Sequence, residues 1–243
     1  MLVLVAAGVG TALATGLGAI PVFFLGERAE LLRPALLGLA AGVMGVASIA
    51  GLLLPGLDEG STLAVLSGLV IGMAFLLAAK SWVRHHDHRS VYARSESRQT
   101  SILVFAVLFV HSLPEGFAIG TAYASDTAGL SLFVIVAIAI QNIPEGTSVA
   151  IPMAAAGFSR SRQFWAAVAT SAPQPVGAVV AYLLTNQINA LLPISFGFAA
   201  GAMLALIVVE LLPQAFRVNW RSAAVGCGIG ALAMLGLSSA LGV

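Results

Sequence analysis

Two segments of this sequence repeat one arrangement of polar residues, proline, glutamate and glycine. They read VHSLPEG at 110–116 and IQNIPEG at 140–146. In each segment a polar residue precedes the glutamate by four positions, so both side chains share one face of a helix, one turn apart. Proline kinks a helix, and glycine lets a neighbouring backbone come close. The repeated pattern predicts two helices that present polar faces to a common point.

The side chains at these positions are typical of a cation site. One imidazole, two carboxylates and one amide come from His111, Glu115, Glu145 and Gln141. A divalent cation would balance the two carboxylates, which are costly inside a membrane. Imidazole with carboxylate and amide oxygen suits zinc and its first-row neighbours, whereas carboxylates alone suit magnesium or calcium. Taken singly, the histidine could be a packing residue and each glutamate a proton relay.

The composition places these segments in a membrane. Of the 243 residues, 59% are hydrophobic and only 9% are charged, and the mean hydropathy is +1.01. A soluble domain would need more charge to cover its surface, and a disordered chain would be less apolar. The net charge of +1 does not indicate nucleic-acid binding, and a single cysteine excludes an internal disulfide or a thiolate metal cluster.

Eight hydrophobic stretches are long enough to span a bilayer. They are 2–25, 34–57, 62–83, 101–124, 128–154, 163–186, 190–213 and 222–242. The paired motifs fall near the middle of the fourth and fifth stretches. We therefore predict an all-α membrane protein in which residues 1–243 form a single transport domain, with a cytoplasmic loop at about 84–100.

The basic residues predict the orientation of the spans. All 11 Lys and Arg residues, Arg33 and Lys80 among them, are assigned to the loops that follow odd-numbered spans. The other loops carry only Asp58, Glu59 and Asp126. The positive-inside rule makes the basic face cytoplasmic and places both termini outside the cell. We expect the protein to lie in the cell membrane.

An internal repeat relates the second span to the seventh. GLAAGVM at 38–44 runs on to LLP at 53–55, and GFAAGAM at 197–203 runs on to LLP at 211–213. These spans run in opposite directions in the predicted topology, as do the inverted repeats of many secondary transporters. We expect eight transmembrane helices, with inverted repeats of helices 1–3 and 6–8 around helices 4 and 5. Chance recurrence of small residues in membrane helices is the alternative.

At the paired motifs the sequence closely resembles the ZIP (Zrt-/Irt-like protein) family of metal-ion transporters, in particular its bacterial GufA-like branch. That family carries a His-Asn-x-Pro-Glu-Gly-type motif in the fourth and fifth of eight membrane helices, and the resemblance covers the whole chain. It implies a primary metal site formed by Met44, His111, Glu115, Gln141 and Glu145. It also implies that metal moves toward the cytoplasm.

The resemblance further implies a second metal site at Ser112, Asn142 and Gln174, together with the shared glutamates. Relatives often have Asn at the first of these positions, Asn or Asp at the second and Glu at the third. All three residues are neutral here, so we predict one main metal site with a polar, uncharged neighbour. Gln141 stands where many relatives have His, which widens the expected selectivity toward iron, manganese or cadmium.

Two polar groups lie outside these motifs. Glu210, near the cytoplasmic end of the seventh span, would receive the ion on its exit route or take up a proton. A carboxylate that pairs helices or reaches the interface is an equally good explanation. His85, His86 and His88 would hold metal weakly on the cytoplasmic side, or simply belong to a solvated basic loop.

These features predict a carrier for a divalent transition metal, most simply zinc, that works by alternating access without a cofactor or enzymatic activity. The sequence has no nucleotide-binding motif, which argues against an ATP-driven pump. A proton channel using Glu115 and Glu145 is one alternative. An intramembrane metalloenzyme is another, although the sequence lacks a His-Glu-x-x-His motif. The expected partners are metal cations and the lipid bilayer, not nucleic acid, and a homodimer is left open.

Overall fold

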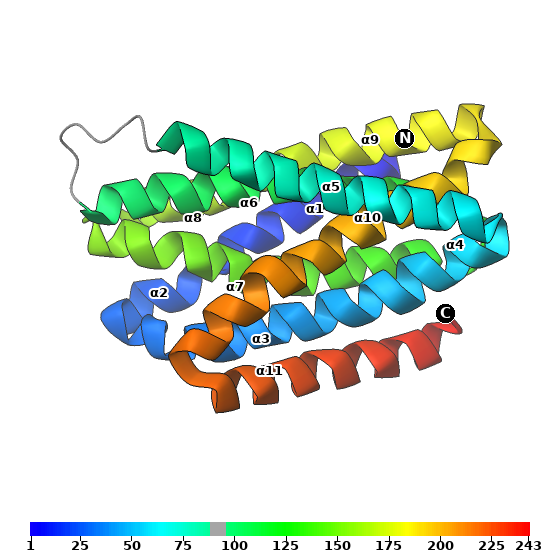
Figure 1. Ribbon diagram of the computed structural model, residues 1–243. Helices are drawn as coiled ribbons and strands as arrows, with labels where there is room; N and C mark the ends of the chain where they lie inside the picture. The colour runs from blue at the N-terminus through cyan, green and yellow to red at the C-terminus, as the bar shows by residue number, and fades with distance from the viewer. Residues whose placement is uncertain (88–95) are drawn as a thin grey trace.

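The computed structural model describes residues 1–87 and 96–243, and every regular element in these ranges is helical. In chain order the elements are α1 (Leu2–Leu17), α2 (Ile20–Leu25), η1 (Gly26–Arg28), α3 (Ala29–Ser48), η2 (Ile49–Leu53), α4 (Leu54–Glu59), α5 (Thr62–Asp87), α6 (Glu96–Ala124), α7 (Leu130–Ala155), α8 (Arg160–Thr170), α9 (Pro173–Gln187), η3 (Asn189–Leu191), α10 (Leu192–Leu206), η4 (Ile207–Leu211) and α11 (Leu212–Leu241). Figure 1 shows the long helices running roughly side by side, with both chain termini and α4 at one end of the bundle and α2 at the other.

The length of the helices and the apolar surface of the bundle suit a lipid bilayer. Seven helical segments in the described part of the chain are long and apolar enough to cross a membrane. Large apolar side chains such as Leu2, Phe24 and Leu63 are strongly exposed, which is favourable in lipid and costly in water. With the backbone paired inside helices, these features identify an all-α integral membrane protein.

The last apolar segment, Asn189–Leu241, is longer than one crossing. It has 53 residues, which correspond to about 80 Å of α-helix, whereas the hydrocarbon core is ~30 Å thick. Its backbone leaves the helical conformation at Asn219, where φ is −157° and ψ is 97°.

The helices pack in pairs through close backbone contacts. α3 packs on α11, α5 packs on α10, α6 packs on α9 and α1 packs on α7. A Cβ atom on Gly42 would overlap the carbonyl of Cys227 in α11, and one on Gly201 would overlap the carbonyl of Leu69 in α5. Small residues therefore allow the helix backbones of a pair to touch, as is common in membranes.

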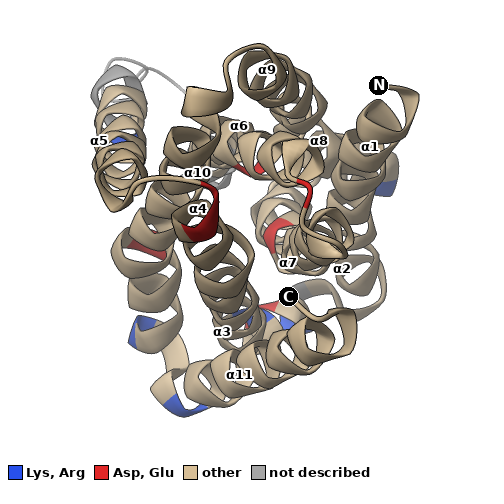
Figure 2. Ribbon diagram, turned by 90° about the vertical axis from the view of Figure 1, so that its right-hand side faces the viewer, with Lys and Arg blue, Asp and Glu red and all other residues tan. Residues whose placement is uncertain are grey.

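The glycines that close the paired motifs make the same kind of contact. A Cβ on Gly116 of α6 would overlap the carbonyl of Gln174 in α9, and one on Gly146 of α7 would overlap the carbonyl of Thr15 in α1. The close approach expected at these glycines is confirmed. Seen end-on in Figure 2, α5 and α11 lie at the periphery of the bundle and α7 lies toward its interior.

Two π-helical turns interrupt the helices that the sequence repeat relates. They are Ile49–Leu53 after α3 and Ile207–Leu211 after α10, and each is followed by Leu-Pro. Proline has no N–H to donate to the carbonyl four residues earlier, so the α-helical hydrogen bond is lost there and a wider turn is favoured.

The structure extends helices into segments that were expected to be loops. α5 continues to Asp87 and α6 begins at Glu96, so both ends of the expected loop at 84–100 are helical. His88 lies outside the described residues, as do the side chains of His85 and His86. Lys80 and Arg33 are not loop residues, because they lie within α5 and α3. A helix can outrun its apolar stretch when long basic side chains reach a polar region.

Candidate metal centre

Helices α6 and α7 bring the paired motifs together inside the bundle. Four side chains, those of His111, Glu115, Gln141 and Glu145, are each at most 3% exposed. The carboxyl groups of Glu115 and Glu145 are close enough for their charges to interact. The backbone therefore brings one imidazole, two carboxylates and one amide together, as the sequence predicted.

Both carboxylate oxygens of Glu115 accept hydrogen bonds from amides. Gln141 Nε2 donates to Oε1 at 2.7 Å, and Gln174 Nε2 donates to Oε2 at 2.7 Å. The first donor comes from α7 and the second from α9. Because hydrogen bonds to an ionised carboxylate are strong and directional, these two donors hold the Glu115 carboxylate in one orientation.

Three buried atoms of this group lack a hydrogen-bond partner among the described residues. They are His111 Nδ1, Gln141 Oε1 and Glu145 Oε1. Each can offer a lone pair, and an unsatisfied buried polar atom costs about 1–3 kcal/mol. His111 and Glu145 line one cavity, so a cation there would meet a nitrogen and a carboxylate oxygen that lack hydrogen bonds. Nitrogen combined with carboxylate and amide oxygen fits a first-row transition-metal ion.

Two methionines, one from α3 and one from α10, border the site. Met44 of α3 is fully buried, and it lines a small void with His111 and Glu115. Met203 of α10 lines the same void. Met203 was not expected from the sequence, although the repeat that equates it with Met44 could have identified it. Two thioethers near the ion would favour softer metals.

Two of the three positions implied for a second metal, Asn142 and Gln174, form a hydrogen-bond network with Thr11. Thr11 Oγ1 of α1 donates to Gln174 Oε1 at 2.7 Å. Asn142 Nδ2 donates to the Thr11 carbonyl at 2.7 Å and to Gln174 Oε1 at 3.2 Å. Ser112 turns its hydroxyl to the carbonyl of Leu108 at 3.1 Å. Thr11 carries no sequence signal, because a lone threonine in an apolar span belongs to no motif.

The described part of the chain contains no cluster of three or more His, Cys, Asp or Glu side chains arranged to hold a metal ion. Binding at the motif residues would therefore depend on amide and thioether ligands, or on small shifts of the carboxylates. Glu145 has one oxygen free for such a shift.

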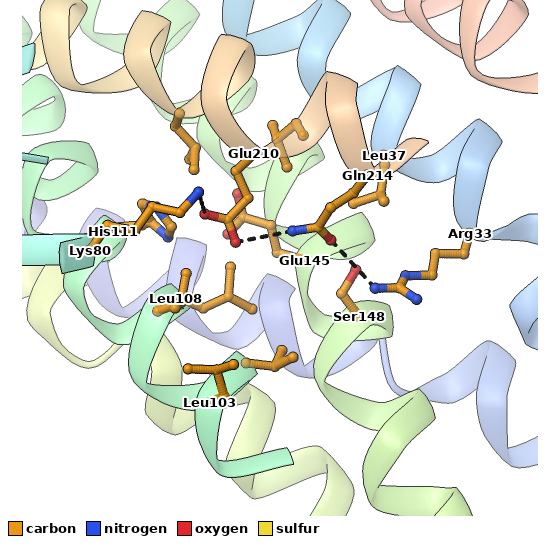
Figure 3. Close-up of a pocket in the computed structure, with 14 residues that line it drawn as sticks. Arg33, Leu37, Lys80, Leu103, Leu108, His111, Glu145, Ser148, Glu210 and Gln214 are labelled. Atoms are coloured by element: carbon orange, nitrogen blue, oxygen red, sulfur yellow. Dashed lines mark hydrogen bonds and ion pairs between the residues drawn. The ribbon is translucent and has the colours of Figure 1, made fainter. Parts of the chain in front are cut away.

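A cavity of about 260 Å³ lies beside this centre. His111 and Glu145 contribute to its wall, together with Glu210, Lys80 and Arg33. Figure 3 shows these side chains reaching the same space from different helices. Glu210 lines the same cavity as His111 and Glu145. Its ion pair with Lys80 of α5 agrees with the explanation that it pairs helices, and its place on an exit route stays a prediction.

The chain is similar to known proteins over most of its length. A family model described as ZIP zinc transporter matches residues 77–238. The chain is 32% identical over 241 residues to the zinc transporter GufA of Myxococcus xanthus, covering 94% of this chain and 95% of that protein. It is 34% identical over 241 residues to the zinc transporter ZIPB of Bordetella bronchiseptica, covering 94% of this chain and 78% of that protein. It is also 36% identical over 208 residues to a longer Arabidopsis thaliana protein that is named as a zinc transporter. That match covers 85% of this chain but only 33% of the Arabidopsis protein.

Proposed function

Because the chain belongs to the ZIP family, we propose that it carries a divalent transition-metal cation across the membrane. Zinc is the first candidate, and iron, manganese and cadmium are the alternatives. The observation that carries this proposal is the buried group of two carboxylates beside an imidazole and an amide, with three lone-pair atoms unpartnered. Two carboxylates and one divalent ion cancel in charge, which makes burial of all three tolerable.

The proposed primary ligands are Met44, His111, Glu115, Gln141 and Glu145. We assign a single main metal to them, because Gln174 and Asn142 are neutral and already use their amides in hydrogen bonds with Glu115 and Thr11. Glu210 would be the next carboxylate on the path, since it shares the cavity with Glu145 and His111.

The proposed topology has eight spans. The break at Asn219 supports a division of the long segment Asn189–Leu241 into two crossings. An even number of spans agrees with termini at one end of the bundle (Figure 1). The matched π-helical turns after α3 and α10 support an inverted repeat of helices 1–3 and 6–8.

Cell-membrane orientation and direction follow from the basic residues. Positive charge marks the cytoplasmic side, and the cavity wall includes Arg33 and Lys80. We propose that both termini are external and that this cavity opens toward the cytoplasm. Metal would then enter the cell through the site, and the structure would represent an inward-facing state.

Alternating access would use two groups of helices as its moving bodies, with α3, α5, α10 and α11 in one and α1, α6, α7 and α9 in the other. Within the helix pairs of each group backbones touch at glycines such as Gly42 and Gly116, so each pair is suited to move as a unit. The primary ligands lie mostly on α6 and α7, whereas Met44 lies on α3. A relative shift of the groups would therefore change access to the metal and would alter its thioether contact.

Uptake by reconstituted vesicles tests this function. Zinc, iron, manganese and cadmium would be offered to wild-type protein and to Glu145→Gln, which has nearly the same shape without the charge. Glu59→Gln is the matched control, because Glu59 is exposed and accepts from Ser125. We expect loss of uptake only in Glu145→Gln. Equal uptake in both variants would refute the site, and a metal-independent proton current would favour a proton channel.

A further inference from the structure

Lys80 places an ammonium group inside the cavity that lies beside the candidate metal centre. Its side chain is only 9% exposed. Its Nζ lies 2.8 Å from Glu210 Oε2 (Figure 3), and it donates to the carbonyl of Val209 at 3.3 Å. The chain therefore keeps one of its own cations on a carboxylate that lines this cavity.

The backbone around Glu210 is built to receive a cation. Val209 and Glu210 belong to the π-helical turn η4. Four residues after Val209 stands Pro213, which has no N–H, so the Val209 carbonyl lacks its α-helical donor. Lys80 takes that carbonyl, while Gln214 Nε2 donates to the remaining Glu210 oxygen at 3.1 Å. A carboxylate beside a freed carbonyl is a set of oxygen ligands that also suits a metal ion.

The second basic side chain of the cavity wall is engaged differently. Arg33 Nη1 pairs with Glu30 at 2.8 Å, and Arg33 Nη2 donates to Gln214 Oε1 at 3.4 Å. Arg33 therefore reaches Glu210 only through Gln214, whereas Lys80 contacts it directly. This difference makes Arg33 a natural control for the role of Lys80.

Building on the transport function proposed above, we propose that the ammonium group of Lys80 competes with the transported metal for two oxygen ligands. These ligands are the carboxylate of Glu210 and the carbonyl of Val209, which together we call the cradle. A metal ion that leaves Glu145 meets a carboxylate already neutralised by the ammonium. The metal ion can then displace Lys80 from the cradle for a short time and move on, but the cradle does not retain the metal ion. Removing the ammonium leaves a carboxylate and a carbonyl open, and converts the exit into a second holding site.

Metal stoichiometry tests this role. Zinc bound per chain would be measured by equilibrium dialysis and elemental analysis of purified protein in detergent, for wild type and Lys80→Leu. We expect Lys80→Leu to hold about one further zinc ion per chain, and to release zinc into the vesicle lumen more slowly than wild type does. The double variant Lys80→Leu/Glu210→Gln should lose the additional zinc, and Arg33→Leu should not gain it.

Two further variants separate competition from simple helix pairing. Lys80→Arg keeps the charge and should bind no additional zinc. Lys80→Gln keeps a donor for Glu210 without the charge, so it should fold and gain the extra zinc even if Lys80→Leu does not fold. An unchanged stoichiometry in Lys80→Gln, or a gain that persists without Glu210, would overturn the role of Lys80. Wild-type vesicles that take up no metal would instead refute the transport function itself.

Discussion

Gln174 and Glu115 are joined by a hydrogen bond of 2.7 Å from Gln174 Nε2 to Glu115 Oε2, between two fully buried side chains. The bond places an amide proton where a carboxylate at position 174 would place an oxygen. If the proposed one-metal centre is correct, the charge at position 174 decides whether a second metal can bind beside the first.

Gln174→Glu should raise the zinc stoichiometry from one ion to two per chain. The new carboxylate would stand beside Glu115 and Asn142, and a second cation would relieve the repulsion between the carboxylates. Calorimetric titration of purified protein with zinc measures this directly. Gln174→Leu removes the same hydrogen bonds without adding charge, so it should stay at one ion. One ion in Gln174→Glu would show that position 174 does not decide the count.

Gly116→Ala should destabilise the fold. Its Cβ would overlap the Gln174 carbonyl, so α6 and α9 would have to separate, and overpacking of this kind costs about 1–3 kcal/mol. Gly228→Ala is the control, because its Cβ meets nothing within 4 Å. Thermal unfolding in detergent should show a lower midpoint for Gly116→Ala alone. Equal midpoints would mean that the two helices are not in backbone contact.

Met44→Leu should reduce cadmium uptake more than zinc uptake. Leucine nearly conserves the volume of methionine but removes the thioether, which favours the softer ion. A loss of ~1 kcal/mol of binding corresponds to a factor of about five. Competition between the two metals in one vesicle preparation gives the ratio. Met234→Leu, another fully buried methionine outside the site, should leave the ratio unchanged, and an unchanged ratio in Met44→Leu would exclude the thioether as a ligand.

A cysteine at position 148 should react with a membrane-impermeant thiol reagent only from the cytoplasmic side. Ser148 lines the cavity with Glu145, and we propose that this cavity opens inward. The substitution would be made with Cys227→Ser, which removes the native thiol. Thr127→Cys is the opposite control, because Thr127 is exposed in the connection between α6 and α7 and should label from outside. Labelling of position 148 from outside would reverse the proposed orientation.

The core of the site could be predicted because its information is local. His111 and Glu115 are one helical turn apart, as are Gln141 and Glu145, so periodicity alone places each pair on one face. Duplication of the motif then indicates that the two faces meet. Burial of these four side chains in the structure agrees with that prediction.

Partners supplied by distant helices could not be predicted in this way. Thr11 joins Gln174 across 163 positions, and Lys80 joins Glu210 only because α5 lies against α10 and the turn that follows it. Counting Lys80 as a loop residue followed from its charge, since an unpaired lysine inside a span is costly. The ion pair with Glu210 is what makes its burial acceptable, and that pair is a tertiary contact.

The neutral side chain at position 174 also has an electrical consequence. Two ionised glutamates and one divalent ion sum to zero, so the loaded centre would cross the bilayer without moving net charge. A charged group crossing the membrane exchanges ~2.3 kcal/mol per elementary charge with a potential of 100 mV. The loaded step would therefore be insensitive to voltage, and the membrane potential would act only on the return of the empty centre, according to how many protons Glu115 and Glu145 carry.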